Sequence, residues 1–338
     1  MPRTTYKKII TSDELTSQIN PKNLKLMERF LREKDTRSSD GTIKGYESDL
    51  TIFFTWVLQN CDNKFFVDIK KIEFAEFFSY TVKILQWNSA RFARMRSCLS
   101  SLSNFIERFF DDEYPTFRNV ILKAVESMPK TASREKTILS KEQIDGLFNY
   151  LENDIKDYQV SCWLALAISS GARFSEILRF TTDIIDLEHT AFEGLFLETL
   201  RPIQTKGRGK HGKILYKYII KDIFEERYKK WLEIREEILK ENNKFHNSIF
   251  IKSDGNPATG VTVRTWVKKI EGFLNLPWYP HAARHYATSY LSSLGLPYNL
   301  IRELFGWEST TMCEIYDDQT AKDKKWAELE NLKNHLDK

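Results

Sequence analysis

Four separated stretches of the chain carry side chains that could act together on a phosphate group. They hold two arginines, a glutamate, a lysine, a histidine, a tryptophan and a tyrosine, namely Arg173, Glu176, Lys206, His281, Arg284, Trp307 and Tyr316. Two arginines, a lysine and a histidine that converge on one phosphate would neutralise its non-bridging oxygens and stabilise a pentavalent transition state. Each residue taken alone has an ordinary structural explanation, such as a helix cap, a loop lysine or a packed tyrosine. The four stretches together, in this order, favour a functional site.

The histidine and the second arginine are expected to share one face of a helix. His281 and Arg284 are three residues apart, which places both side chains on the same side of an α-helix. The opposite face is apolar and would anchor the helix in the core (Ala287, Tyr290, Leu291 and Leu294). The sequence therefore predicts a buried helix that presents His281 and Arg284 outward as an anion site.

The lysine belongs to a predicted β-hairpin between residues 194 and 221. The segment 213–220 is rich in β-forming residues, and the stretch before it, Lys206-Gly-Arg-Gly-Lys-His-Gly, has the glycines of a turn. We expect a hairpin with a long basic tip, in which Lys206 ends the first strand. The hairpin could present Lys210 to the phosphate instead of Lys206. Arg208 and Lys210 are also candidate DNA contacts.

The chain is expected to form two mainly helical domains, because 338 residues are too many for one compact core. Residues 1–20 are expected to be a polar lead-in, and residues 21–127 a helical domain. Residues 128–137 contain a proline with small and charged residues and no periodicity, which indicates a linker. Residues 138–338 are expected to form a mixed, mainly helical second domain with a small antiparallel β-sheet.

Several helix ends are marked in this second domain. Ser140 and Gln143 match a capping box, with Ser140 as the N-cap. Gly295 is expected to stop one helix, Pro297 to start the next at its first position, and Gly306 to end it.

One helix of the first domain carries three arginines on one side. Its buried face has apolar residues at helical spacing (Phe92, Met95, Leu99, Leu102, Ile106 and Phe109). Its other side holds Arg91, Arg94 and Arg96 among serines. The planar guanidinium group matches phosphate oxygens, so these arginines are candidate DNA contacts. A solvated helix face is the alternative explanation.

Bulk composition restricts the class of protein without identifying a partner. The chain has a net charge of +4, with 41% hydrophobic and 29% charged residues, which fits a protein with well-formed cores. So small an excess of positive charge does not by itself indicate nucleic-acid binding. The four cysteines (Cys61, Cys98, Cys162 and Cys313) form no CxxC pair, which argues against a zinc site or a disulfide framework. Because no segment has the pattern of a signal peptide or a membrane span, we expect a cytoplasmic protein without a membrane partner.

The chain resembles the tyrosine recombinase (phage integrase) family. Gly171-Ala-Arg-Phe-Ser-Glu is similar to the family's Gly-x-Arg-x-Ser-Glu box, and residues 281–307 are similar to its longest signature block. The similarity extends from about Ile138 to Asp318. The family pattern of Arg, hairpin Lys, His-x-x-Arg, His or Trp, and Tyr is matched by Arg173, Lys206, His281, Arg284, Trp307 and Tyr316. The resemblance implies a two-domain fold, with a helical core-binding domain and a mixed catalytic domain that form a clamp around double-stranded DNA.

The resemblance also implies a reaction mechanism. Tyr316 would attack the scissile phosphate, form a 3′-phosphotyrosyl link and release a 5′-hydroxyl. Arg173 and Arg284 would clamp the phosphate, with His281 assisting as acid/base or hydrogen-bond donor. Lys206 would act as general acid on the leaving 5′ oxygen.

The remaining implications of the resemblance concern supporting groups and partners. Trp307 would donate from its indole N–H, and Glu176 would support the first arginine. No metal or nucleotide cofactor is implied, because the phosphotyrosyl bond conserves the energy. The protein would act on DNA as a homo-oligomer, from dimer to tetramer.

The residues around Tyr316 depart from the family pattern. Asp317 and Asp318 follow the tyrosine directly, and Glu308 and Glu314 precede it. Carboxylates beside a DNA phosphate would repel it unless they turn away or pair with lysines. A regulator, such as a phage repressor, that keeps DNA binding without recombination therefore stays open as an alternative. A type IB topoisomerase, which shares the nucleophile chemistry, is a third and less favoured alternative, because the N-terminal helical domain resembles that of recombinases.

The 22 residues after Tyr316 include a Trp/Leu pattern at every third position. Trp326, Leu329 and Leu332 form it, followed by His335 and Leu336. Such a helix fits packing on its own domain or, as the resemblance implies, docking into a neighbouring protomer.

Overall fold

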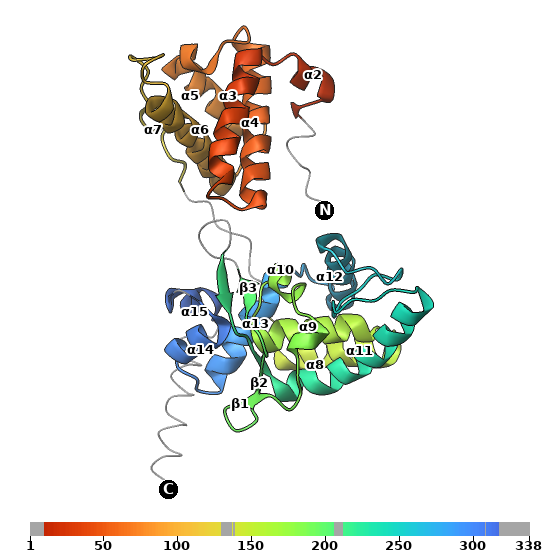
Figure 1. Ribbon diagram of the computed structural model, residues 1–338. Helices are drawn as coiled ribbons and strands as arrows, with labels where there is room; N and C mark the ends of the chain where they lie inside the picture. Colours follow the sequence, from red (N-terminus) through yellow and green to blue (C-terminus); the bar gives the residue numbers. More distant parts are fainter. Residues whose placement is uncertain (1–9, 130–136, 138, 206–211, 308, 318–338) are drawn as a thin grey trace, which may run out of the picture. The chain divides into compact units, whose positions relative to one another are not determined.

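The chain forms two compact, mainly helical units (Figure 1). The computed structural model describes residues 10–129, 137, 139–205, 212–307 and 309–317. Within these ranges, residues 10–129 make the N-terminal unit and residues 137–317 the C-terminal unit.

The N-terminal unit is a helical bundle around an aromatic core. Its helices are α2 (Asp13–Ser17), α3 (Pro21–Asp35), α4 (Asp40–Asn60), α5 (Lys71–Lys83), α6 (Ser89–Phe109) and α7 (Ile121–Ala124), with a 3-10 turn at Phe66–Asp68. The buried ring of Phe53 on α4 lies 4.9 Å from that of Phe77 and 5.7 Å from that of Phe74, both on α5. These ring pairs tie the two helices together. The predicted apolar face of α6 is buried from residue 92 to residue 106, whereas Phe109 is 47% exposed.

Part of the expected lead-in packs onto this unit. Ile10 and Ile19 are buried in its core. Asn20 accepts from the backbone N–H of Lys22 at the start of α3 and makes two hydrogen bonds with Asn63. Residues 10–20 are therefore attached more closely than their polar composition indicates.

The C-terminal unit is built around the buried helix α9 (Tyr158–Ser170). All residues from Val160 to Ser170 are buried, as expected for a helix that is apolar on every side. Against it pack α11 (Lys221–Glu241) and α13 (Pro280–Ser293). The other helices are α8 (Lys141–Asn149), α10 (Phe174–Ile177), α12 (Gly260–Leu274), α14 (Tyr298–Phe305) and α15 (Thr311–Tyr316), with a π-helical turn at Tyr150–Asp154 and a 3-10 turn at Thr182–Ile184.

Two small antiparallel sheets complete this unit. One has the order β1 (Thr190–Ala191), β2 (Phe196–Glu198), β5 (Tyr218–Ile220), and the other pairs β3 (Ile203–Thr205) with β4 (Lys213–Leu215). The predicted hairpin is the β3–β4 pair, in which Thr205 faces Lys213. The β-forming segment 213–220 is divided between the sheets, because β5 pairs with β2. The mainly helical fold with small antiparallel sheets confirms the predicted fold class.

The predicted helix ends are largely confirmed. Ser140 and Gln143 form the capping box, with reciprocal hydrogen bonds of 3.2 and 2.9 Å. Gly306 ends α14 in the left-handed region, with φ +66°. Pro297 lies one residue earlier than expected, as the N-cap of α14.

Candidate active site

Arg173 and Glu176 lie at the turn between α9 and α10. α9 ends at Gly171, whose φ of +55° lies in the left-handed region that favours glycine. A Cβ at this position would lie 2.7 Å from the ring of Phe305, so the turn packs closely against the end of α14. The backbone N–H and the guanidinium of Arg173 donate to the two oxygens of Glu176, at 2.9 and 2.7 Å. The carboxylate therefore fixes both the backbone and the side chain of this arginine.

A second cation, Lys217, lies beside Glu176 and comes from the link between β4 and β5. Its side chain is buried, its Nζ is 3.9 Å from Oε2 of Glu176, and it donates to the backbone oxygen of Phe305 at 3.0 Å. Burial lowers the pKa of Lys217 to about 8; Glu176 opposes this shift, and Arg284 and Arg173 add to it. Both arginines of the predicted site therefore act on this one buried ammonium group.

The carboxyl of Glu176 responds to the same neighbours. Burial by itself would raise the pKa of Glu176. The charge of Lys217 and the hydrogen bonds from Arg173 outweigh burial, so the pKa lies below its ordinary value. Glu176 is therefore held as a carboxylate.

Arg284 and Trp307 form another part of the cluster. Arg284 on α13 is 1% exposed, and its guanidinium carbon lies 4.8 Å from the centre of the Trp307 ring. The outward orientation predicted for Arg284 is therefore wrong, because the side chain is buried against the indole of Trp307. His281, at the start of the same helix, is exposed as predicted. Leu294, expected in the core, is 59% exposed.

The turn that carries Trp307 is packed against the β4–β5 link. A Cβ on Gly306 would lie 2.6 Å from Cδ1 of Leu215 on β4. The backbone N–H of Trp307 donates to the carbonyl of Arg302 at 2.8 Å, and its ring lies 5.2 Å from that of Phe305. The close approach at Gly306 thus sets the position of the indole.

The cluster contains three cations and one carboxylate. Among the described residues, the charges of Arg284 and Arg173 disfavour the protonated form of Lys217, whereas the carboxylate of Glu176 favours it. A bound anion would stabilise such an arrangement. Arg173 keeps 27% of its side chain exposed, so a ligand can reach the cluster. The positively charged donors of this cluster suit a phosphate group on which negative charge develops.

The predicted nucleophile ends α15, which packs against α13 and α14. The backbone of Tyr316 forms the last residue of this helix. The next residue, Asp317, is 7% exposed, and its carboxylate accepts a hydrogen bond of 2.8 Å from the hydroxyl of Tyr298. This carboxylate therefore points toward α14. Asp318 and Glu308 lie outside the described residues.

Three predicted site residues also lie outside the described ranges. They are Lys206, Arg208 and Lys210, in the loop that joins β3 to β4. Their roles stay predictions.

In the N-terminal unit, Arg91 and Arg94 share the buried carboxylate of Asp49. Arg91 Nη1 lies 2.7 Å from Oδ1, and Arg94 Nε donates to Oδ2 at 3.0 Å. Arg96 donates instead to two backbone carbonyl groups, at 2.7 and 3.0 Å. The Arg91 side chain is 16% exposed and that of Arg94 is 56% exposed. Arg94 is therefore the more accessible of the two that hold Asp49.

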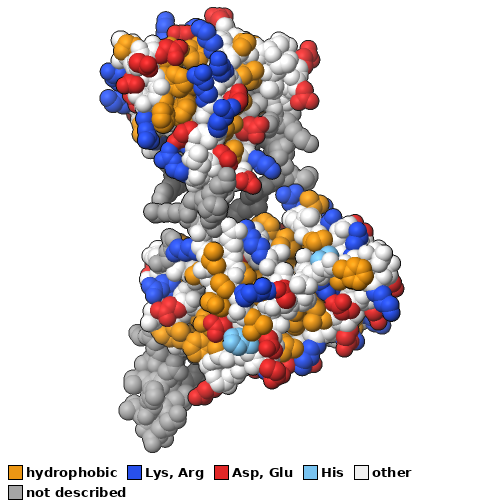
Figure 2. Space-filling model, viewed as in Figure 1, with side chains coloured by type: hydrophobic (Ala, Val, Ile, Leu, Met, Phe, Trp, Pro, Cys, Tyr) orange, Lys and Arg blue, Asp and Glu red, His pale blue; other side chains and the backbone are white. Residues whose placement is uncertain are grey.

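Charged side chains of both signs are intermixed over each unit on the face drawn in Figure 2. This distribution agrees with the small net charge of +4. Selectivity for an anion must therefore come from local clusters such as the one around Glu176.

Lys217 is the member of the cluster that the sequence patterns did not identify. It interrupts a strand-forming segment and lies two positions before Ile219, which is fully buried. Lysine is almost never fully buried unless it is paired. A lysine between two β-forming stretches was the signal that could have revealed it.

The described residues contain no group of three or more His, Cys, Asp or Glu side chains placed to hold a metal ion. In the same part of the chain, every helix is too short or too polar to cross a membrane.

One partly exposed and one buried arginine, a tryptophan and a helix-terminal tyrosine on such a fold define the class of the tyrosine recombinases. Residues 137–323, more than half of the chain, match the model of the phage integrase family. The chain belongs to this family and is a tyrosine recombinase, a DNA breaking and rejoining enzyme.

Individual relatives support this assignment. The SPbeta prophage-derived recombinase-like protein YomM of Bacillus subtilis is 29% identical over 227 residues, which cover 66% of each chain. Tyrosine recombinase XerC of Oceanobacillus iheyensis is 25% identical over 295 residues, 85% of this chain and 88% of XerC. The fold is shared with XerH site-specific recombinase bound to palindromic difH substrate in a post-cleavage complex. That structure has a TM-score of 0.67 at 18% identity, and the match covers 91% of this chain and 95% of XerH.

Proposed function

We propose that this chain cuts one DNA strand with Tyr316, holds it as a 3′-phosphotyrosyl intermediate, and rejoins it to a second strand. The tyrosine hydroxyl gives up its proton, for which His281 is the proposed acceptor, as its oxygen forms a bond to the scissile phosphorus and the bond from phosphorus to the 5′ oxygen breaks. Lys206 gives its proton to that oxygen, which leaves as a hydroxyl. We place this activity in the cytoplasm of a bacterium, on bacterial or phage DNA.

The observation that carries this proposal is the buried cluster around Glu176. Arg173 and Arg284 bind the non-bridging oxygens of the phosphate, and His281 assists as acid/base or hydrogen-bond donor. Trp307 adds its indole N–H, and Glu176 keeps Arg173 in place. The surplus of positive charge in the cluster favours the transition state, in which more negative charge lies on the phosphate oxygens.

The position of Asp317 also supports catalysis over a binding-only regulator. Its carboxylate is engaged by the Tyr298 hydroxyl and is nearly covered. A carboxylate held in this way contributes less repulsion to a phosphate beside Tyr316 than one in contact with the DNA.

A nicked suicide substrate tests the proposal, with the protein's own site first recovered by binding selection from genomic fragments. Wild type should form a covalent protein–DNA adduct. The short fragment between the cleavage point and the nick dissociates after cleavage, so the strand cannot be rejoined. Tyr316→Phe should form none, and Tyr158→Phe, at the start of α9, should behave as wild type. Site-specific binding by wild type without an adduct would contradict the enzyme and support the regulator.

We further propose that double-stranded DNA is held mainly through its phosphates, with Arg94 among the contacts. Binding should therefore weaken steeply as salt rises. Arg208 and Lys210, which lie between β3 and β4 in the sequence, are proposed as additional phosphate contacts.

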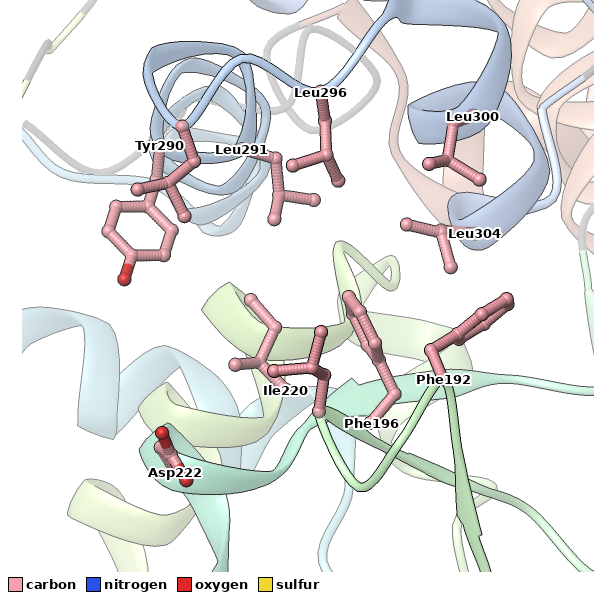
Figure 3. A pocket seen from close by; sticks show the side chains of 11 residues that line it. Phe192, Phe196, Ile220, Asp222, Tyr290, Leu291, Leu296, Leu300 and Leu304 are labelled. Atoms are coloured by element: carbon pink, nitrogen blue, oxygen red, sulfur yellow. The ribbon is translucent and has the colours of Figure 1, made fainter. Parts of the chain in front are cut away.

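The recombinase is proposed to act on DNA as a homo-oligomer of two to four protomers. The C-terminal unit has an apolar groove of about 370 Å³ between the β1–β2 turn and the segments of α13 and α14. In Figure 3, Phe192, Phe196 and Ile220 lie on one side of it and face Leu291, Leu296, Leu300 and Leu304 on the other. Phe192 is 50% exposed, so the groove is accessible apolar surface of the kind that marks interaction sites.

We place the C-terminal segment 319–338 of a neighbouring protomer in this groove. Its Trp326, Leu329 and Leu332 have the apolar chemistry and the helical spacing that the groove requires. Trp326→Ala should leave binding to a half-site unchanged and reduce assembly on the full site, as measured by sedimentation of the protein–DNA complex. Equal assembly by both proteins would contradict docking of this segment.

A further inference from the structure

Lys217 occupies a position that connects two halves of the phosphate-binding cluster. Its Nζ lies 3.9 Å from the carboxylate of Glu176, which in turn holds Arg173 through two hydrogen bonds. The same Nζ donates to the carbonyl of Phe305, directly before the Gly306 turn that places Trp307. One ammonium group therefore links the arginine of α10 to the end of α14.

A purely structural explanation does not account for this lysine. The side chain is 1% exposed, and moving an ammonium group out of water is unfavourable even when a carboxylate is near. Replacing a buried ion pair with apolar residues of similar size is often neutral or stabilising. Two guanidinium groups, those of Arg284 and Arg173, also disfavour the ammonium charge at this position, and a bound anion would favour it.

We propose that Lys217 is a positioning residue of the recombinase: its ammonium fixes Glu176 and the Phe305 carbonyl, and thereby holds Arg173 and Trp307 in place around the scissile phosphate. Lys217 does not need to touch the DNA. Its charge also adds to the positive field at the phosphate, together with Arg173 and Arg284. This inference rests on the proposed cleavage reaction, because it assigns a role within that reaction.

The protonation of Lys217 gives the proposal a specific signature. The charged groups that face it are Glu176 and Arg173 at α10 and Arg284 on α13, and its pKa is about 8. As pH rises above this value, the ammonium loses its proton and the link between Glu176 and Phe305 weakens. A phosphate bound beside the ammonium would raise this pKa, so in the DNA complex the loss should begin somewhat above pH 8.

The main test is the rate of adduct formation by Lys217→Met on the nicked substrate, with saturating protein, from pH 6.5 to 9.5. At pH 7 the variant should be about 10-fold to 100-fold slower, the range seen when groups that orient catalytic ligands are removed. Its affinity for the DNA should change by less than about 3-fold, since phosphate contacts elsewhere dominate binding. The ratio of wild-type to variant rate should fall toward one as pH rises, because wild type then loses the same charge. A ratio that does not change with pH would overturn the proposal.

Two further variants separate positioning from folding. Lys217→Arg keeps a permanent charge, so its activity should lack the decline above pH 8 that wild type shows; an unaltered decline would count against the proposal. In the double variant Lys217→Met with Glu176→Gln, the rate should equal that of the slower single variant, whereas additive losses would contradict action through Glu176. Lys240→Met, at an exposed position in the last turn of α11, is the matched control and should behave as wild type.

A separate measurement distinguishes failure of this inference from failure of the proposed function. If wild type forms no adduct, strand cleavage is wrong, and Lys217 is then judged by inorganic phosphate alone. Phosphate should raise the Tm of wild type more than that of Lys217→Met, with Lys240→Met as control. Equal shifts in the three proteins would show that Lys217 has no part in the anion site.

Discussion

Each unit buries one carboxylate between basic side chains, and the two carboxyl groups respond in opposite directions. Burial raises the pKa of Asp49 in the N-terminal unit, and Arg91 and Arg94 do not fully compensate it. In the C-terminal unit, Lys217 and Arg173 outweigh the burial of Glu176 and lower its pKa. Neighbouring cations thus decide whether a buried carboxyl is stabilised in its charged form.

The difference indicates two uses of buried charge. Asp49 forms ion pairs with two guanidinium groups of the same helix, those of Arg91 and Arg94. Of these two arginines, only Arg94 is well exposed. Glu176 is held between the charges of Lys217 and Arg173, and Lys217 in turn lies in the field of the buried Arg284. The first arrangement suits a helix that lies along DNA phosphates, and the second suits a pocket for one phosphate.

The largest effect that tests this comparison is expected at Arg284. Arg284→Ala should slow adduct formation on the nicked substrate by about 1000-fold, the upper range for removal of one donor to a developing negative charge. Single-turnover rates at saturating protein measure it. Arg201→Ala removes an exposed ion pair with Asp183 and should change the rate little. A loss below about 10-fold for Arg284→Ala would mean that the cluster is not where the phosphate is activated.

The next largest effect concerns the turn that carries Arg173. Gly171→Ala places a Cβ 2.7 Å from the Phe305 ring at a φ of +55°, so the free energy of unfolding of the C-terminal unit should fall by about 3 kcal/mol. Gly272→Ala, in the same unit, meets open space within α12 and should raise it by up to about 1 kcal/mol. Urea denaturation followed by tryptophan fluorescence measures both. Equal stabilities would show that the α9–α10 turn is not tightly held against α14.

A smaller effect is expected at Arg94 in the N-terminal unit. Arg94→Ala should weaken DNA binding by about 10-fold and reduce the slope of log affinity against log salt by about one, as for loss of one phosphate contact. Fluorescence anisotropy over a salt series measures this. Arg118→Ala is the control, since Arg118 is exposed and its guanidinium donates to two nearby backbone carbonyls. An unchanged salt slope would remove Arg94 from the interface and leave it as a partner of Asp49 only.

The smallest effect sharpens the comparison of the two carboxyls. A raised pKa means that the folded state binds a proton more tightly than the unfolded state, so the contribution of Asp49 to stability falls as pH rises through the carboxyl range, about pH 3 to 6. The pKa of Glu176 is lowered, so its contribution rises over the same range and is lost as pH falls. Hydrogen exchange should resolve the two units, with Asp49→Asn and Glu176→Gln each removing the pH dependence of its own unit. If the stability contributions of Asp49 and Glu176 changed in the same direction with pH, the comparison would be contradicted.

Much of the site was predictable because its residues occur in short local patterns. The Arg173–Glu176 pair and the helix that carries His281 and Arg284 depend on residues three positions apart, and so does the capping box at Ser140 outside the site. The pairing of the strands was harder to predict from the sequence. The segment 213–220 is uniformly β-forming, so its sequence does not indicate that β4 pairs with β3 while β5 pairs with β2.

The sequence by itself determined which residue types occur in which order, and that order identified the recombinase class. Tertiary structure alone decided that Lys217 joins the cluster, because its partner Phe305 lies 88 positions away and no periodicity relates the two. It also decided that Arg284 lies beneath Trp307 and that Asp317 turns toward Tyr298. These facts depend on how α10, α13 and α14 pack around the buried α9, since burial and distance between remote segments are properties of packing and not of local sequence.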